Sequence, residues 1–219
     1  MQAYISALNY VDRIGKLCAT DPSVSTYMFS AKALADPEDF AFLAVGCTVE
    51  FTLENGKVRN LQPATLRSVD EVARYSMPDN VSFESGHLRD GYEILDVGRL
   101  RLSKMSRDVN KARAELASLC RSLGGNTLLE VTERQEQRTA MAYAFIFHIV
   151  QGYVAVAGRP DAQGNMDASD LLSSINHQEI KRCGQQHENK AAGKIALKLL
   201  GGVLLLCFAV GYIYSTFLH

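Results

Sequence analysis

The chain has 219 residues, a formal net charge of −1 and 47% hydrophobic residues. This composition excludes a disordered chain and a protein that binds nucleic acid through overall positive charge. The length allows one ordinary domain or two small ones, each with a modest core. The five cysteines are scattered and form no Cys-x-x-Cys pair, which is typical of a reducing compartment.

Short apolar runs separated by turn residues fill residues 1–66. Four of them alternate as strands do, at residues 4–8, 27–29, 47–53 and 57–61. Between the last two runs, Asn55-Gly56 supplies the positive φ values of a two-residue hairpin turn. The sequence therefore predicts a small all-β module.

This module resembles the cold-shock domain family. The strand that contains Gly46, Val49 and Phe51, the hairpin after it and the strand ending at Pro63 match the family's closing strands. The match continues upstream through residues 27–34 and 14–17 to Asn9. The resemblance implies a five-stranded OB-like barrel, and cold-shock domains bind single-stranded nucleic acid by stacking bases on aromatic side chains.

The chain departs from the family at that aromatic surface. The family's aromatic and histidine positions are held here by Ala7, Leu8, Ile14, Lys16, Met28 and Ser30. A nucleic-acid platform would instead have to use Tyr10, Lys16, Tyr27 and Phe29, and packing in the core or at a sheet edge is the competing interpretation of these aromatic residues. Single-stranded nucleic-acid binding is therefore the alternative function and not the leading one.

Residues 67–85 mix charged residues, serine and a proline, and predict a linker. An α+β domain follows over residues 86–160. A strand begins near Gly91, an apolar stripe predicts a helix over 107–123 that ends at Gly124-Gly125, and further strands are expected at 126–131, 142–150 and 153–157. The polar run 132–139 is expected to turn the chain.

Residues 91–95, 123–131 and 151–156 of this domain are similar to the YbjQ family, small bacterial proteins described as heavy-metal binders and expected to assemble as rings. The resemblance implies self-assembly. The residues themselves point the same way, because the strand at 142–150 is apolar on both faces and the helix covers one face only. The barrel, the C-terminal helix or another subunit would cover the second face.

Residues with catalytic or metal-binding chemistry are sparse. Cys120 lies on the apolar stripe of the predicted helix, His148 lies in an apolar strand and His87 near the domain start, without metal-ligand spacing. Glu93 and Asp96 are expected to be surface carboxylates, and no phosphate loop, nucleophile elbow or metalloprotease motif occurs. We therefore expect no enzyme, no metal and no cofactor, and metal or stress sensing is a second alternative.

The C-terminal part predicts a membrane anchor. Residues 161–194 form a juxtamembrane segment, with a helix running from Leu171 toward Lys190, and residues 195–218 a transmembrane helix. The uncharged run 199–217 would span about 29 Å as a helix, close to the thickness of a bilayer core; it includes Leu199, Leu204, Phe208, Tyr212 and Phe217. Basic residues precede this run and none follows, which places the body in the cytoplasm; they are Lys181, Arg182, Lys190, Lys194 and Lys198.

These observations predict a tail-anchored, single-pass protein of the bacterial inner membrane. Its fold class is α+β: an OB-like barrel, an α+β sandwich domain and one transmembrane helix. Its expected function is that of a non-enzymatic scaffold or regulatory protein that contacts the bilayer, forms homo-oligomers and binds a further protein partner through its cytosolic modules.

Overall fold

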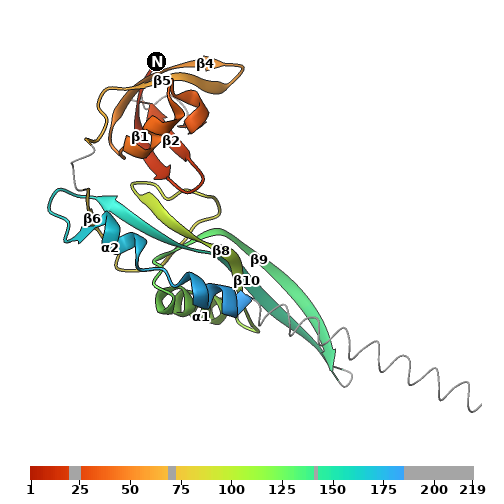
Figure 1. The fold of residues 1–219 in the computed structure, drawn as a ribbon. Coiled ribbons are helices and arrows are strands. Elements are labelled where there is room, and N and C mark those ends of the chain that lie inside the picture. The colour runs from red at the N-terminus through yellow and green to blue at the C-terminus, as the bar shows by residue number, and fades with distance from the viewer. Residues whose placement is uncertain (20–25, 69–72, 141–142, 185–219) are drawn as a thin grey trace, which may run out of the picture. The chain divides into compact units, whose positions relative to one another are not determined.

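The computed structural model describes residues 1–19, 26–68, 73–140 and 143–184. The chain forms two compact units, residues 1–180 and 181–219. The first unit is an α+β structure built on one large mixed sheet with two α-helices, α1 and α2, and a further helix begins at residue 177 (Figure 1). The α+β class expected from the sequence is therefore confirmed.

The N-terminal module contains five strands, and all except the second lie where the alternating runs predict strands. They are β1 (Gln2–Asn9), β2 (Ile14–Ala19), β3 (Thr26–Ser30), β4 (Thr48–Glu54) and β5 (Lys57–Pro63). β1 pairs with both β2 and β4, β2 pairs with β3, and β4 pairs with β5, all antiparallel. Asn55 and Gly56 have φ values of 51° and 73°, as the predicted hairpin turn requires.

Barrel closure is not present as a strand ladder in the described residues. The residue after η1, Leu34, forms an isolated parallel bridge with Leu61 of β5. The short helices η1 (Ala31–Ala33) and η2 (Pro37–Phe42) follow β3. They contribute Ala31, Ala33 and Phe40 to a core shared with the five strands, so the module has its own buried interior.

The C-terminal part of the sheet is formed by three long strands, β8 (Glu93–Ser106), β9 (Thr127–Ala140) and β10 (Tyr143–Pro160). β10 lies between β8 and β9 and pairs antiparallel with both. β1 pairs in parallel with the start of β8, through Leu8 with Glu93 and Asn9 with Ile94. The two predicted modules are therefore parts of one continuous sheet.

Helix α1 (Val109–Ser122) forms where the apolar stripe predicts a helix. Its N-cap Asp108 accepts a hydrogen bond from Asn110 N, and its buried residues are Ala112, Leu116 and Cys120. Helix α2 (Ala168–Leu172) begins at Asp167 with a capping box. Both helices lie on the same face of the β8–β10 sheet (Figure 1). Strand β10 contacts both. Val154 packs against Gly125, just after α1, and Gly158 packs against Leu171 of α2.

Three local expectations are wrong. The polar run 132–139 does not turn the chain but continues β9, opposite the start of β10. The segment between the modules contains two strands, β6 (Arg74–Ser76), which pairs with β10, and β7 (Ser82–Phe83), which pairs with β9. The helix expected from Leu171 onward is interrupted after α2 and resumes at residue 177. The short strand β11 (Met166–Asp167) completes the sheet beside β6.

Candidate functional site

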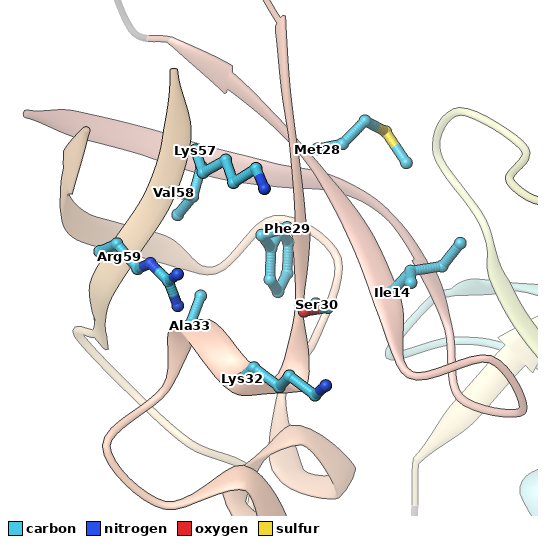
Figure 2. Close-up of a pocket in the computed structure, with 9 residues that line it drawn as sticks. All are labelled: Ile14, Met28, Phe29, Ser30, Lys32, Ala33, Lys57, Val58 and Arg59. Atoms are coloured by element: carbon cyan, nitrogen blue, oxygen red, sulfur yellow. The ribbon is translucent and has the colours of Figure 1, made fainter. Parts of the chain in front are cut away.

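A hollow of about 410 Å³ opens on the N-terminal module between β3 and β5 (Figure 2). Its floor is apolar, with Phe29 and Val58 buried. Three exposed cationic side chains surround it, Lys32 from η1 and Lys57 and Arg59 from β5. Among the residues that the structure describes, none of these three cations forms an ion pair. The hollow can therefore accept an anionic group.

Of the four residues predicted as a nucleic-acid platform, Phe29 lies in this hollow. It is 5% exposed, and a Cβ at Gly15 would lie 2.4 Å from its ring, so the ring packs directly on the β2 backbone. Tyr27 packs against Phe51 with ring centroids 5.5 Å apart. Tyr10 points instead to the joint with the second part of the sheet, where its hydroxyl shares its one proton between Leu43 O at 2.7 Å and Glu93 Oε2 at 3.0 Å.

Lys16, the fourth predicted residue, is paired. Its Nζ lies 2.8 Å from the Asp90 carboxylate, and Gly91 N donates to Ser6 O at 2.7 Å. The chain before β8 therefore contacts the outer surface of β1 and β2. The four residues contribute to separate contacts and do not form one exposed aromatic surface.

The joint between the two parts of the sheet is built around Glu93, which is fully buried. Its carboxylate accepts two hydrogen bonds of 2.8 Å from Arg67, one of 2.8 Å from Tyr75, one of 3.0 Å from Tyr10 and one of 2.8 Å from Val45 N. The expectation that Glu93 is a surface carboxylate is wrong. All of its partners except Val45 contribute side chains, and they come from separate parts of the chain.

Burial and the negative charge of Glu93 raise the pKa of Tyr10 and of Tyr75. Burial alone would lower the pKa of Arg67, but the hydrogen bonds and charge of Glu93 outweigh it and raise that pKa. Arg67 therefore remains a cation, both tyrosines remain neutral donors, and the joint is held by charge-assisted hydrogen bonds. This arrangement holds the two parts of the sheet together. Its titratable groups, Tyr10, Arg67, Tyr75 and Glu93, are engaged in hydrogen bonds with one another.

A third feature lies on the sheet face opposite α1 and α2. It is a hollow of about 290 Å³, lined in part by Val11, Val97, Leu129 and Tyr153. His87 at its edge lies 3.2 Å from both Asp12 and Glu130. In residues 1–19, 26–68, 73–140 and 143–184, no group of three or more His, Cys, Asp or Glu side chains is placed to hold a metal.

The residues weighed as metal ligands lie in different settings. Cys120 is buried on α1 and directs its thiol toward Thr127 O at 3.6 Å. Burial raises the pKa of this thiol to about 12, so the thiol is protonated at neutral pH. His148 is half-buried on β10, in register with Ser106 and Gln135.

The predicted membrane span lies outside the described residues, as do Lys190, Lys194 and Lys198. Lys181 and Arg182 are described and are exposed in the helix that begins at residue 177. Within the described part of the chain, no helix combines the length and apolar character needed to cross a bilayer.

Comparison of the chain with protein-family models, with curated proteins and with solved structures gives no significant match.

Sequence reasoning missed the joint entirely. Arg67 and Tyr75 fell in a stretch interpreted as a linker, and Glu93 in an ordinary strand. The available signal was a carboxylate at the first position of a strand that continues with Ile94 and Leu95, because a charge beside a buried strand needs a partner.

Proposed function

We propose that this chain is a non-enzymatic scaffold or regulatory protein, held in the bacterial inner membrane by residues 199–217 with its body in the cytoplasm. Copies of the chain associate through the second part of the sheet. The uncharged run and the basic residues before it support the anchor and the orientation.

The observation that carries the scaffold role is the joint at Glu93. A buried, fully hydrogen-bonded ion pair fixes the β1–β5 module to the β8–β10 sheet, and the β1–β8 pairing continues the backbone ladder across the same boundary. Modules that act on a mobile substrate are commonly joined by flexible linkers. A rigid joint instead holds the hollow of Figure 2 and the far end of the sheet at a constant separation, as a scaffold requires.

The finer fold is part of the same proposal. The order β3-β2-β1-β4-β5 and the bridge from Leu34 to Leu61 support an OB-like barrel whose last seam is closed by side-chain packing. Phe29 and Leu61, both buried, lie on the two sides of that seam.

Self-association is supported by the sheet face opposite the helices. Val97 and Tyr153 there are only half-buried, and Val11 beside them is 49% exposed. Half-buried and exposed apolar side chains around a surface hollow are typical of a protein contact. We assign this surface to a second copy of the chain.

The test measures the mass of the full chain in lipid nanodiscs. Wild-type protein should have a defined oligomeric mass, and Val11→Asp should weaken association by at least about tenfold, because it places a charge in the contact. Met28→Asp is the matched control, since Met28 is 56% exposed and does not line this hollow. A monomeric wild type, or equal effects of the two variants, would remove self-association from the proposal.

A second candidate, single-stranded nucleic-acid binding, is favoured by one observation, the three cations around the hollow in Figure 2. Titration of the full chain with a short pyrimidine strand tests it. Binding that weakens with salt and is lost in Lys57→Glu/Arg59→Glu would support it, whereas binding that is unchanged in that variant would locate the nucleic acid elsewhere. The platform of Tyr10, Lys16, Tyr27 and Phe29 stays a prediction.

A further inference from the structure

The hairpin formed by β9 and β10 extends beyond the end of β8. Ser106, the last residue of β8, pairs with His148, so residues 143–147 of β10 have only β9 as a described neighbour. We name this part, residues 136–140 with residues 143–147, the ribbon (Figure 1). A two-stranded ribbon in water is marginally stable without a hydrophobic surface to pack on.

The ribbon exposes apolar side chains on both of its faces. Tyr143 is 71% exposed and Ile146 is 55% exposed. Odd- and even-numbered positions of a strand face opposite sides, so these two side chains point in opposite directions. Phe145 and Phe147 lie half-buried on the same side as Tyr143.

Arginines lie immediately behind this apolar end. The Arg107 guanidinium lies 4.2 Å from the ring centroid of Phe145, and that of Arg138 lies 5.4 Å from that of Phe147. Arg134 lies on β9, in register with Ile149 of β10, and its side chain is exposed. The aromatic rings hold two of these cations in place without neutralising them.

Carboxylates of β9 neutralise only part of this charge. Glu133 pairs with Arg113 of α1, and Glu136 pairs with Arg138. In the described part of the chain, neither Arg107 nor Arg134 forms an ion pair. The chain as a whole has a net charge of −1, so the cationic character is local to this end of the sheet.

These features distinguish between possible occupants. A second copy or a nucleic-acid strand lying on the sheet would cover one face and leave either Tyr143 or Ile146 in water. The interfacial region of a bilayer surrounds an inserted ribbon on both faces, accepts tyrosine and phenylalanine rings, and attracts arginine to anionic headgroups.

We propose that the ribbon inserts its apolar end into the headgroup region of an anionic phospholipid bilayer and forms a second membrane contact of the cytosolic body. This inference rests on the proposed membrane anchoring, which brings the body close to a bilayer. Arg107 and Arg134 bind lipid phosphates, while Tyr143 and Ile146 enter the boundary between headgroups and acyl chains.

The absence of tryptophan from the chain permits a direct test. Tyr143→Trp gives the full-length protein a single tryptophan, the ribbon tryptophan. Met28→Trp gives a single tryptophan at an exposed position of the N-terminal module, the control tryptophan. Both proteins are placed in nanodiscs of phosphatidylcholine with or without phosphatidylglycerol, prepared with lipids that carry a shallow spin-label quencher. The ribbon tryptophan should emit at shorter wavelength and be quenched at least about twofold more than the control tryptophan, most strongly with phosphatidylglycerol.

A charge variant tests the role of the arginines. Arg134→Gln in the Tyr143→Trp background should reduce the preference for anionic over neutral lipid by roughly fivefold, as expected for one arginine near an anionic surface. Arg99→Gln, which removes an exposed arginine of β8 outside the ribbon, should leave the preference unchanged.

The outcomes separate this inference from the anchor. If the protein co-elutes with nanodisc lipid but the ribbon tryptophan is quenched no more than the control tryptophan, the inference is overturned and the anchor stands. If the protein does not co-elute but the ribbon tryptophan is quenched when anionic vesicles are added, the anchor fails and the ribbon contact stands. An emission shift of the ribbon tryptophan that depends on protein concentration and not on lipid would identify a second copy as the occupant and overturn the inference.

Discussion

Glu93 is the residue on which the arrangement of the body depends. A buried carboxylate is costly unless every lone pair finds a donor, and here Arg67, Tyr10, Tyr75 and Val45 N supply them. Loss of one partner leaves the others buried and unpaired. The network is therefore sensitive to conservative changes at its centre.

Glu93→Gln should lower the free energy of unfolding by about 3–5 kcal/mol, because it leaves the Arg67 charge without its counter-ion. The measurement is thermal unfolding of the full chain in detergent. Glu50→Gln, at an exposed carboxylate of β4, is the matched control and should change stability by less than about 0.5 kcal/mol. Equal melting temperatures for the two variants would show that the joint adds no stability.

Cys120 predicts a dependence on alkaline pH. Its pKa is about 12 in the folded chain and close to 9 in the unfolded chain, because burial penalises the thiolate. The stabilisation is fully present below about pH 9 and is lost as pH rises toward 12, since the unfolded state releases its proton first. The free energy of unfolding should fall by up to about 1.4 kcal/mol per pH unit in that range.

The check compares melting temperatures of wild type and Cys120→Ala at pH 8 and pH 10.5. The decrease between the two pH values should be smaller in Cys120→Ala. Tyr10 and Tyr75, whose pKa values are also raised, are present in both proteins and do not contribute to the difference. Identical decreases would contradict the assignment to Cys120.

At the scale of elements, the end of α1 depends on Gly124. This residue has a φ of +84°, and a Cβ here would lie 1.8 Å from Ser174 O in the segment after α2. Gly124→Ala should therefore destabilise the chain by roughly 1–3 kcal/mol through backbone strain and steric overlap.

Gly86→Ala is the control for this prediction, because Gly86 has an ordinary φ and open space around its Cα. Thermal unfolding of both variants in detergent measures the difference. If Gly124→Ala and Gly86→Ala have equal melting temperatures, the end of α1 accommodates the added Cβ without loss of stability, and the prediction is wrong.

Local pattern was sufficient for most elements of this fold. Four of the five N-terminal strands, the Asn55-Gly56 hairpin and helix α1 could be predicted because alternation, turn chemistry and the apolar stripe act over a few residues. The extension of β9 could not. Residues 132–139 have no apolar alternation of their own. They form a strand because they pair with β10, and this partner cannot be read from their own sequence.

At the scale of the whole molecule, the joint could not be predicted from local pattern. Tyr10 and Glu93 are separated by 83 positions, and Arg67 and Glu93 by 26. Whether Phe29 and Tyr10 are exposed is likewise decided by which distant segments pack on them, which periodicity within one strand does not encode. The candidate nucleic-acid platform was therefore the part of the sequence analysis least constrained by local physics.

The anchor gives a prediction for the whole chain. Leu204→Arg places a charge in the middle of the uncharged run, which costs about 2.5–3.5 kcal/mol at the centre of a bilayer. Most of the variant should be extracted from membranes by alkaline carbonate, whereas Leu204→Val should stay with wild type in the membrane pellet. Retention of Leu204→Arg in the pellet would mean that residues 199–217 do not hold the chain.

The most direct measurement is the protease sensitivity of an N-terminal epitope tag on the full chain in bacterial spheroplasts. The account predicts that the tag sediments with the inner membrane, resists protease added to intact spheroplasts and is digested once they are lysed. Digestion in intact spheroplasts, or recovery of the tag in the soluble fraction, would contradict a membrane-anchored protein with a cytoplasmic body.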